Sequence, residues 1–231
     1  MLLSNSYLGI IPARGGSKGI YKKNLLLINN KPLIQYTIEA SKKSLLNDFV
    51  VTTDDYEIAD FVYSLGVKVI MRPPELSSDD TPTLPVINHV LENINDRFDA
   101  SVLLQPTSPL RNSKHINEAI LLFDHNKEAK SLVSVVKTPH NHIPESIMLL
   151  DSNGYLCSYK ENSSVFLRRQ DKPTYFSRNG AAIYISLLDV LCTEIWGDRT
   201  IPYFMEYLDS FDIDTLDDAK LVELLIQSKY H

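Results

Sequence analysis

The sequence has few of the residues that mark disulfide-rich, membrane-spanning or nucleic-acid-binding proteins. Its two cysteines, Cys157 and Cys192, cannot form a disulfide framework and have no metal-ligand spacing, so we expect buried free thiols. No apolar run approaches the roughly 20 residues of a membrane span, and the first residues do not resemble a secretory signal. A net charge of −6 argues against general nucleic-acid binding. We therefore expect a cytoplasmic protein with neither nucleic-acid nor membrane partners.

The rest of the composition is that of an ordinary globular protein. Of the 231 residues, 44% are hydrophobic and 23% are charged, and this length suits one large α/β domain. The six histidines show no spacing typical of a metal site or a catalytic triad. We predict a single domain over residues 1–231.

Of the eight glycines, three stand in one short basic loop at residues 10–20, directly after an apolar run. A buried strand that ends in such a loop leaves backbone N–H groups free to point at an anion, and glycine lets the main chain approach its oxygens. The positive charges of the loop can neutralise a polyphosphate. The glycine spacing fits neither the Walker loop nor GxGxxG. We predict a triphosphate site here, against the alternative of a basic surface loop, and assign to it Ala13, Arg14, Gly15, Gly16, Ser17, Lys18 and Lys23.

Apolar runs of strand length alternate with segments of helical spacing along most of the chain. We predict strands at 7–11, 49–53, 67–71, 100–104 and 131–136, and helices at 33–40, 56–65, 84–94, 113–123 and from 215. Alternation of this kind, with continuously apolar strands, is typical of a parallel sheet that is buried on both faces. The predicted fold is a Rossmann-like, mostly parallel sheet with helices on both faces.

The segment at about 139–176 breaks this alternation. Two short apolar runs flank Asp151–Gly154, whose Asn-Gly pair predicts a hairpin turn. An isolated two-stranded hairpin is marginally stable in water, so its apolar face needs a partner. We expect an inserted arm that serves dimerisation.

Candidate capping residues stand at the starts of three predicted helices. Ser113 is a candidate cap, Asp55 can begin the helix after 55, and Thr215 with Asp218 forms a capping-box pattern before a helix bearing Leu221, Leu224 and Leu225.

The second cluster of chemical groups is Asp212-Ile213-Asp214. In an extended segment, residues i and i+2 project to the same side, so both carboxylates can face one point while Ile213 packs away. Two adjacent carboxylates repel each other unless a cation lies between them, and Mg²⁺ bound through one or two carboxylates plus phosphate oxygens is a common solution. The alternative is a solvated Asp212 and an Asp214 that favours the following helix start.

Six further blocks occur in order after the opening loop: Asp54, Arg72-Pro73-Pro74-Glu75-Leu76, Leu104–Arg111, Arg169-Gln170 with Pro173, Asn179-Gly180 and Asp212–Asp214. Together with the loop, over about residues 7–226, they resemble the CMP-sialic acid synthetases, also called acylneuraminate cytidylyltransferases. One block alone would be weak support, but this set in register is strong.

The resemblance implies a reaction of CTP with a nine-carbon 2-keto sugar acid that yields CMP-sugar and pyrophosphate, with Mg²⁺ (or Mn²⁺) as the metal. It places Arg14 and Lys23 at the triphosphate and Asp212 and Asp214 at the metal, and these four are the expected catalytic residues. Around the cytidine it places Asn24, Arg72 and Thr83, and toward the sugar it places Gln105, Arg169, Gln170 and Asn179. Members of the family are typically homodimers, and the resemblance places an arm near Trp196 at the partner's sugar site.

The identity of the sugar substrate stays open. Where neuraminate enzymes often have a lysine, this chain has Ile143-Pro144-Glu145, which favours a bacterial relative such as legionaminate or pseudaminate over N-acetylneuraminate. Alternatives are the shorter acid Kdo, a neutral sugar with another nucleotide, and a non-catalytic nucleotide-binding protein on the same scaffold.

Overall fold

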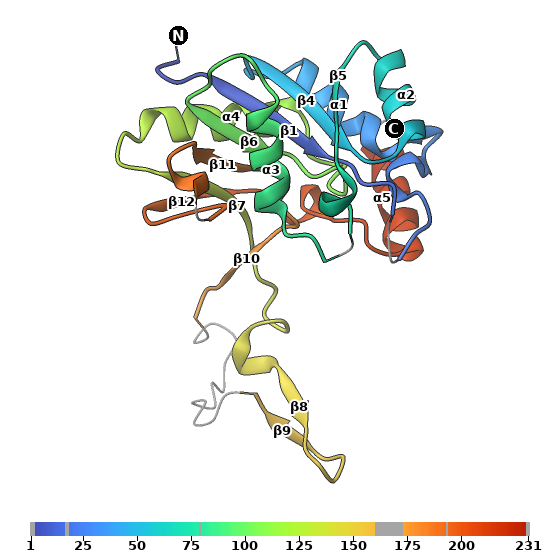
Figure 1. The fold of residues 1–231 in the computed structure, drawn as a ribbon. Coiled ribbons are helices and arrows are strands. Elements are labelled where there is room, and N and C mark those ends of the chain that lie inside the picture. Colours follow the sequence, from blue (N-terminus) through green and yellow to red (C-terminus); the bar gives the residue numbers. More distant parts are fainter. Residues whose placement is uncertain (1–2, 17–18, 79, 160–172, 193, 230–231) are drawn as a thin grey trace.

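The structure is a computed structural model that describes residues 3–16, 19–78, 80–159, 173–192 and 194–229. Its centre is an eight-stranded sheet in the order β10-β7-β11-β6-β1-β4-β5, with β12 also paired to β7 (Figure 1). The strands are β1 (Tyr7–Pro12), β4 (Asp48–Thr53), β5 (Lys68–Met71), β6 (Ala100–Leu103), β7 (Ser131–Lys137), β10 (Phe176–Arg178), β11 (Tyr184–Leu187) and β12 (Thr200–Phe204). The short strands β2 (Leu27–Ile28) and β3 (Lys31–Pro32) pair separately.

Strand direction divides the sheet into two parts. The strands β5, β4, β1 and β6 are all parallel, whereas β10 and β11 run antiparallel to their neighbours. The chain winds from β1 to β4 and β5 in one direction and then returns to place β6 on the other side of β1. Ligands of such sheets bind beyond the carboxyl ends of the strands, where the winding reverses. The gap between β1 and β6 is therefore the place to look for a site.

Helices cover both faces of the sheet, as predicted. Along β1, alternate residues enter different core clusters: Tyr7 and Ile11 pack with α1 (Leu33–Lys42), α2 (Tyr56–Ser64) and α4 (Ser113–His125), whereas Leu8 and Ile10 pack with α3 (Thr83–Glu92). The last helix, α5 (Leu216–Lys229), belongs to a third cluster that includes Ile213. Of the helices that the structure describes, none has both the length and the apolar composition for crossing a membrane.

Two details of the helices differ from expectation. The cap of α4 is the side chain of Asn112, which accepts hydrogen bonds from two backbone N–H groups, and Ser113 is already the first helical residue. On α5, Ala219, Val222 and Ile226 are buried and Leu225 packs against their cluster, whereas Leu221 and Leu224 are exposed. The other caps are confirmed: Asp55 caps α2, and Thr215 and Asp218 hydrogen-bond reciprocally.

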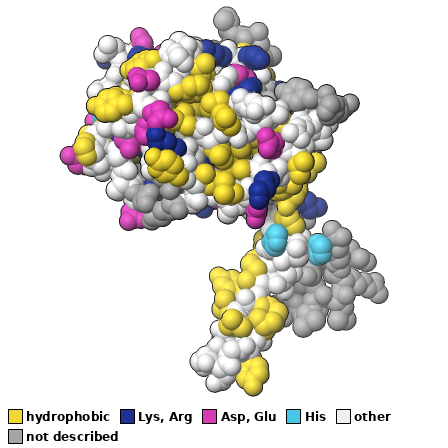
Figure 2. Space-filling model, turned by 90° about the vertical axis from the view of Figure 1, so that its right-hand side faces the viewer, with side chains coloured by type: hydrophobic (Ala, Val, Ile, Leu, Met, Phe, Trp, Pro, Cys, Tyr) yellow, Lys and Arg dark blue, Asp and Glu magenta, His cyan; other side chains and the backbone are white. Residues whose placement is uncertain are grey.

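Between β7 and β10 the chain leaves the sheet and projects from the body as an arm (Figure 1). Its hairpin consists of β8 (Met148–Leu150) and β9 (Leu156–Ser158), joined by the predicted turn. The hairpin's apolar side chains are largely exposed, and Figure 2 shows them along the arm. Cys157 lies on β9 and is exposed, so our expectation of a buried thiol is wrong for this residue. An unpaired hairpin has no second layer on which to bury it.

Candidate active site

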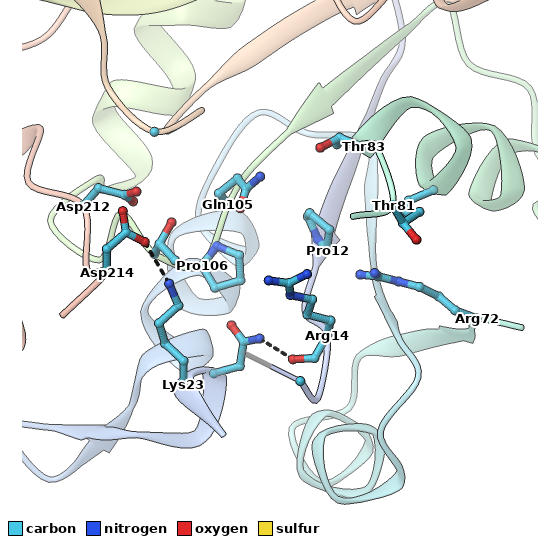
Figure 3. A pocket seen from close by; sticks show the side chains of 15 residues that line it. Pro12, Arg14, Lys23, Arg72, Thr81, Thr83, Gln105, Pro106, Asp212 and Asp214 are labelled. Atoms are coloured by element: carbon cyan, nitrogen blue, oxygen red, sulfur yellow. Dashed lines mark hydrogen bonds and ion pairs between the residues drawn. The ribbon is translucent and has the colours of Figure 1, made fainter. Parts of the chain in front are cut away.

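A cavity of about 340 Å³ lies at the carboxyl edge of the parallel strands, at the point where the winding reverses. Three of its lining residues stand just after strand ends: Arg14 follows β1, Arg72 follows β5 and Gln105 follows β6. The 3₁₀ turn Lys23–Leu25 and the start of α3 add further walls. The lining consists of Pro12, Arg14, Gly16, Lys23, Asn24, Arg72, Thr81, Thr83, Val86, Gln105, Pro106, Thr107, Gly180, Asp212 and Asp214 (Figure 3).

One side of this cavity is cationic. The guanidinium group of Arg72 donates to the Thr52 carbonyl oxygen (2.8 Å) and hydroxyl (3.2 Å), which fixes its direction. Burial lowers the pKa of Arg72 to about 10, and the nearby charge of Arg14 acts in the same direction, against the opposing effect of Asp54. Asn24 donates to the Arg14 carbonyl oxygen (2.8 Å) and so orders the loop. Arginines held this close together favour a polyanion between them.

The other side carries the two carboxylates. Ile213 is fully buried and its N–H donates to the Thr107 carbonyl oxygen (2.9 Å), so Asp212 and Asp214 both project toward the cavity, as expected (Figure 3). Lys23 donates to the Asp214 carboxylate (3.0 Å) and to the Ile213 carbonyl oxygen (2.9 Å). The cationic loop is thereby joined to the acidic segment.

The environment of Asp212 determines its proton affinity. Burial raises the pKa of the Asp212 carboxyl group, and the charge of Asp214 raises it further. Hydrogen bonds from the Thr107 and Ser108 hydroxyls and the charge of Lys23 oppose these effects; the Ser108 hydroxyl lies 3.2 Å from Asp212 Oδ1. A divalent cation would lower the pKa in the same way.

These donors fit a metal that is shared with a substrate. In the part of the chain that the structure describes, no group of three or more histidine, cysteine or acidic side chains surrounds a common point. Two carboxylates are too few for a cation cage made by protein alone, but Mg²⁺ is typically bound by one or two carboxylates together with phosphate oxygens and water. A hard cation at Asp212 and Asp214 would therefore need phosphate oxygens or water to complete its shell.

The turn at Gly180 fits tightly behind Asp212. Gly180 has a φ of +66°, in the left-handed region that favours glycine. A Cβ atom at this position would lie 2.5 Å from Asp212 Cγ. Only glycine allows both the backbone conformation and the close approach of the carboxylate.

A second cavity, of about 720 Å³, adjoins the first and shares three of its residues, Thr83, Gln105 and Gly180. Its other lining residues are Leu103, Phe176, Ser177, Arg178, Ala181, Tyr184, Ile195 and Trp196, and no acidic residue is among the described residues that line it. The guanidinium group of Arg178 lies 4.6 Å from the centre of the Trp196 ring, and Tyr184 packs edge-on against the same ring. The cavity therefore combines one cation with an aromatic wall.

Trp196 lies outside the arm and packs against Tyr184 and Arg178 of its own chain. Its expected place at a partner's sugar site stays a prediction. Sequence reasoning missed Arg178 and Thr107, which no motif singled out individually.

Three residues assigned to binding lie elsewhere. Ala13 is fully buried, and its N–H extends the β1–β4 ladder by donating to the Thr52 carbonyl oxygen (2.9 Å). Gly15 turns toward Asp54, which accepts its N–H (3.0 Å). Asn179 is 5% exposed and uses its side-chain amide on Ser134 and Ser210, so it lines neither cavity. Four other assigned residues, Ser17, Lys18, Arg169 and Gln170, lie outside the described residues.

Comparisons with known proteins agree with this geometry. The cytidylyltransferase family matches residues 8–227. N-acylneuraminate cytidylyltransferase from Escherichia coli O18:K1:H7 is 34% identical over 96% of this chain and 52% of its own length. CMP-N,N'-diacetyllegionaminic acid synthase from Legionella pneumophila is also 34% identical, over 95% of this chain and 96% of its own length. The chain therefore spans about half the length of the first of these relatives and nearly all of the second.

Among solved structures, CMP:2-keto-3-deoxy-manno-octonic acid synthetase complexed with CTP has a TM-score of 0.74, at 18% identity over 97% of this chain and 99% of that one. The 4-diphosphocytidyl-2C-methyl-D-erythritol synthase from Anaerococcus prevotii has a TM-score of 0.61 at 12% identity, covering 96% of each chain. At these identities the likeness concerns the fold. The family match and the relatives of 34% identity decide the assignment: the chain belongs to the cytidylyltransferase family.

Proposed function

We propose that the protein is a cytidylyltransferase that activates a nonulosonic acid, a nine-carbon 2-keto sugar acid, with CTP. The observation that carries the proposal is the pair of adjoining cavities that share Gln105 and Gly180. One holds cations suited to a triphosphate, and the other holds a cation and aromatic rings suited to a sugar acid. Relatives named for N-acylneuraminate and for N,N'-diacetyllegionaminate support this class of substrate.

In the reaction, the anomeric hydroxyl oxygen of the sugar acid forms a bond to the α-phosphorus of CTP. The bond from that phosphorus to the bridging oxygen breaks, pyrophosphate leaves, and the hydroxyl proton passes to a base. Catalysis of such a transfer depends mainly on positioning and on neutralising the charge that develops on the phosphates. Arg14, Lys23 and Arg72 would bind the nucleotide, with Asn24 holding the loop in place.

Asp212 and Asp214 would hold the divalent cation, Mg²⁺ or Mn²⁺, together with the nucleotide's phosphates. When bound, the metal would neutralise the charge on those phosphates. Lys23 keeps Asp214 in place through its hydrogen bond, and the Ser108 hydroxyl orients Asp212. Both carboxylates are thus fixed before any ligand arrives.

The sugar acid would occupy the second cavity. Its carboxylate would pair with Arg178, whose guanidinium group is held by the Trp196 ring and has no acidic neighbour among the described lining residues. Gln105, which faces both cavities, would bind the sugar close to the phosphate.

We further propose that the arm joins two copies of the chain. Met148, Leu150 and Leu156 are 51%, 71% and 65% exposed, which is an unfavourable amount of apolar surface for an isolated hairpin. A second copy of the arm offers an equivalent apolar face, and an isologous contact would bury both.

A pyrophosphate-release assay tests the proposed reaction. The protein would be given CTP, Mg²⁺ and, in turn, N-acetylneuraminate, N,N'-diacetyllegionaminate, pseudaminate, Kdo and a neutral hexose. We expect release with at least one nonulosonic acid, none with the hexose, and loss of release when UTP or GTP replaces CTP. Release with Kdo alone would contradict the proposed substrate class.

A further inference from the structure

Arg111 is a buried cation directly behind the two cavities. It stands in the loop between β6 and α4, is 1% exposed and lines neither cavity. Its guanidinium group donates to the carbonyl oxygens of Gln105 (3.1 Å) and Ala182 (2.8 Å) and to the Thr37 hydroxyl. Within the described residues, all these partners are uncharged oxygens.

The two carbonyl groups belong to the segments that separate the cavities. Gln105 and Gly180 line both cavities, and the Gln105 N–H also donates to the Ala181 carbonyl oxygen (3.3 Å). Arg111 thus joins the loop after β6 to the turn at 180–182. The same turn fits against Asp212 through Gly180.

Burying a cation is expensive, and no carboxylate is among the described hydrogen-bond partners of Arg111, so the charge of Asp212 offsets the lost hydration only through space. Burial lowers the pKa of Arg111 to about 9, so the group is still charged at neutral pH. An amide side chain could donate to two carbonyl oxygens without that expense. The rigid, planar fork of arginine, however, fixes the angle between its partners as well as their distance.

We propose that Arg111 is a positioning residue for the transfer: by holding Gln105 and the turn at 180–182 at a fixed separation, it aligns the sugar hydroxyl with the α-phosphate. The inference rests on the proposed function, since it assigns the sugar to the second cavity. Within the described residues, Arg111 has no hydrogen bond to Arg14, Lys23 or Arg72, the cations of the first cavity. Its loss therefore affects alignment much more than CTP binding.

The test compares Arg111→Lys with wild type by pyrophosphate release, with CTP affinity measured by calorimetry and folding by thermal melting. Lysine keeps the positive charge and loses the fork. We expect turnover with the sugar acid to fall about 100-fold, the typical effect of a misplacement near 1 Å, while CTP affinity stays within a few-fold. Arg199→Lys is the control, because Arg199 forms an exposed pair with Glu128, and it should match wild type.

A second pair of variants covers the case in which Arg111→Lys does not fold. Thr37 is fully buried on α1, away from both cavities, and its hydroxyl accepts from Arg111. Thr37→Val should lower turnover without lowering CTP affinity, and Thr37→Ser, which keeps the hydroxyl, should restore it. If Arg111 and Thr37 had a merely structural role, Arg111→Lys and Thr37→Val would have lower melting temperatures but unchanged turnover at saturating substrates.

Turnover within a few-fold of wild type in folded Arg111→Lys, or in Thr37→Val, would overturn this inference but leave the proposed function intact. A loss of CTP affinity as large as the loss of turnover would also overturn it, because the nucleotide cavity would then depend on Arg111. Wild-type protein that releases no pyrophosphate with any sugar acid would instead overturn the proposed function, and this inference with it.

Discussion

Replacing Gly180 by alanine should disable the site through one added methyl group. The new Cβ would lie 2.5 Å from Asp212 Cγ and 2.6 Å from its Oδ2. Carbon atoms in contact prefer about 3.5–4.0 Å, so the carboxylate or the turn must move by about 1 Å. A shift of that size in a catalytic group can lower the rate about 100-fold. We expect this loss in the pyrophosphate-release assay at saturating CTP.

The backbone strain of the substitution needs its own control, which Gly66 provides. It has a φ of +69°, close to that of Gly180, but a Cβ there would meet nothing within 4 Å. Alanine in the left-handed region costs about 1–2 kcal/mol at either position, which corresponds to a fall of about 2–8 °C in melting temperature. Gly66→Ala should therefore lose stability but keep full turnover. If Gly180→Ala also kept full turnover, the contact between Gly180 and Asp212 would have no role in the reaction.

Three further variants test the remaining assignments. Asp214→Asn should bind CTP normally but lose about 100-fold in turnover, as is typical for a lost electrostatic group; near-normal rates at saturating Mg²⁺ would exclude a metal role. Gly16→Val should abolish CTP binding in calorimetry, because the open space beside Gly16 faces the nucleotide cavity; unchanged binding would place the phosphates elsewhere. Leu150→Asp on the arm should convert a dimer to a monomer in sedimentation, whereas wild-type protein that is monomeric at micromolar concentration would refute the arm contact.

Much of the lining of the first cavity could be predicted from the sequence, because it depends on strand ends. The carboxyl ends of parallel strands meet at one edge of a sheet, so residues placed just after β1, β5 and β6 converge whatever the details of packing. Arg14, Arg72 and Gln105 are such residues, and all three line the cavity. The pair Asp212 and Asp214 was predictable for a similar reason, since alternation in an extended segment needs only local geometry.

The contacts of buried polar groups could not be predicted in this way. Arg111 belongs to the block Leu104–Arg111, whose motif suggests ligand binding. Its side chain instead donates to the carbonyl oxygens of Gln105 and Ala182. Likewise, the exposed leucines of α5 fit a helical pattern as well as its buried residues do. Which of two equivalent faces is buried depends on the neighbouring elements, and a single sequence does not contain that information.

Arg178 and Asn179 show that two adjacent residues can have entirely different environments, one in a cavity and one in the interior. They are adjacent in the chain at the end of β10, and neighbouring residues of an extended strand project to opposite sides. A shift of one residue in register would exchange their environments. The pairing of Arg178 with Val135 on β7 fixes the register so that Arg178 reaches Trp196 in the second cavity, while Asn179 turns to Ser134 and Ser210 in the interior. Because strand register is a long-range property, the sequence alone could indicate this segment but not the residue that faces the ligand.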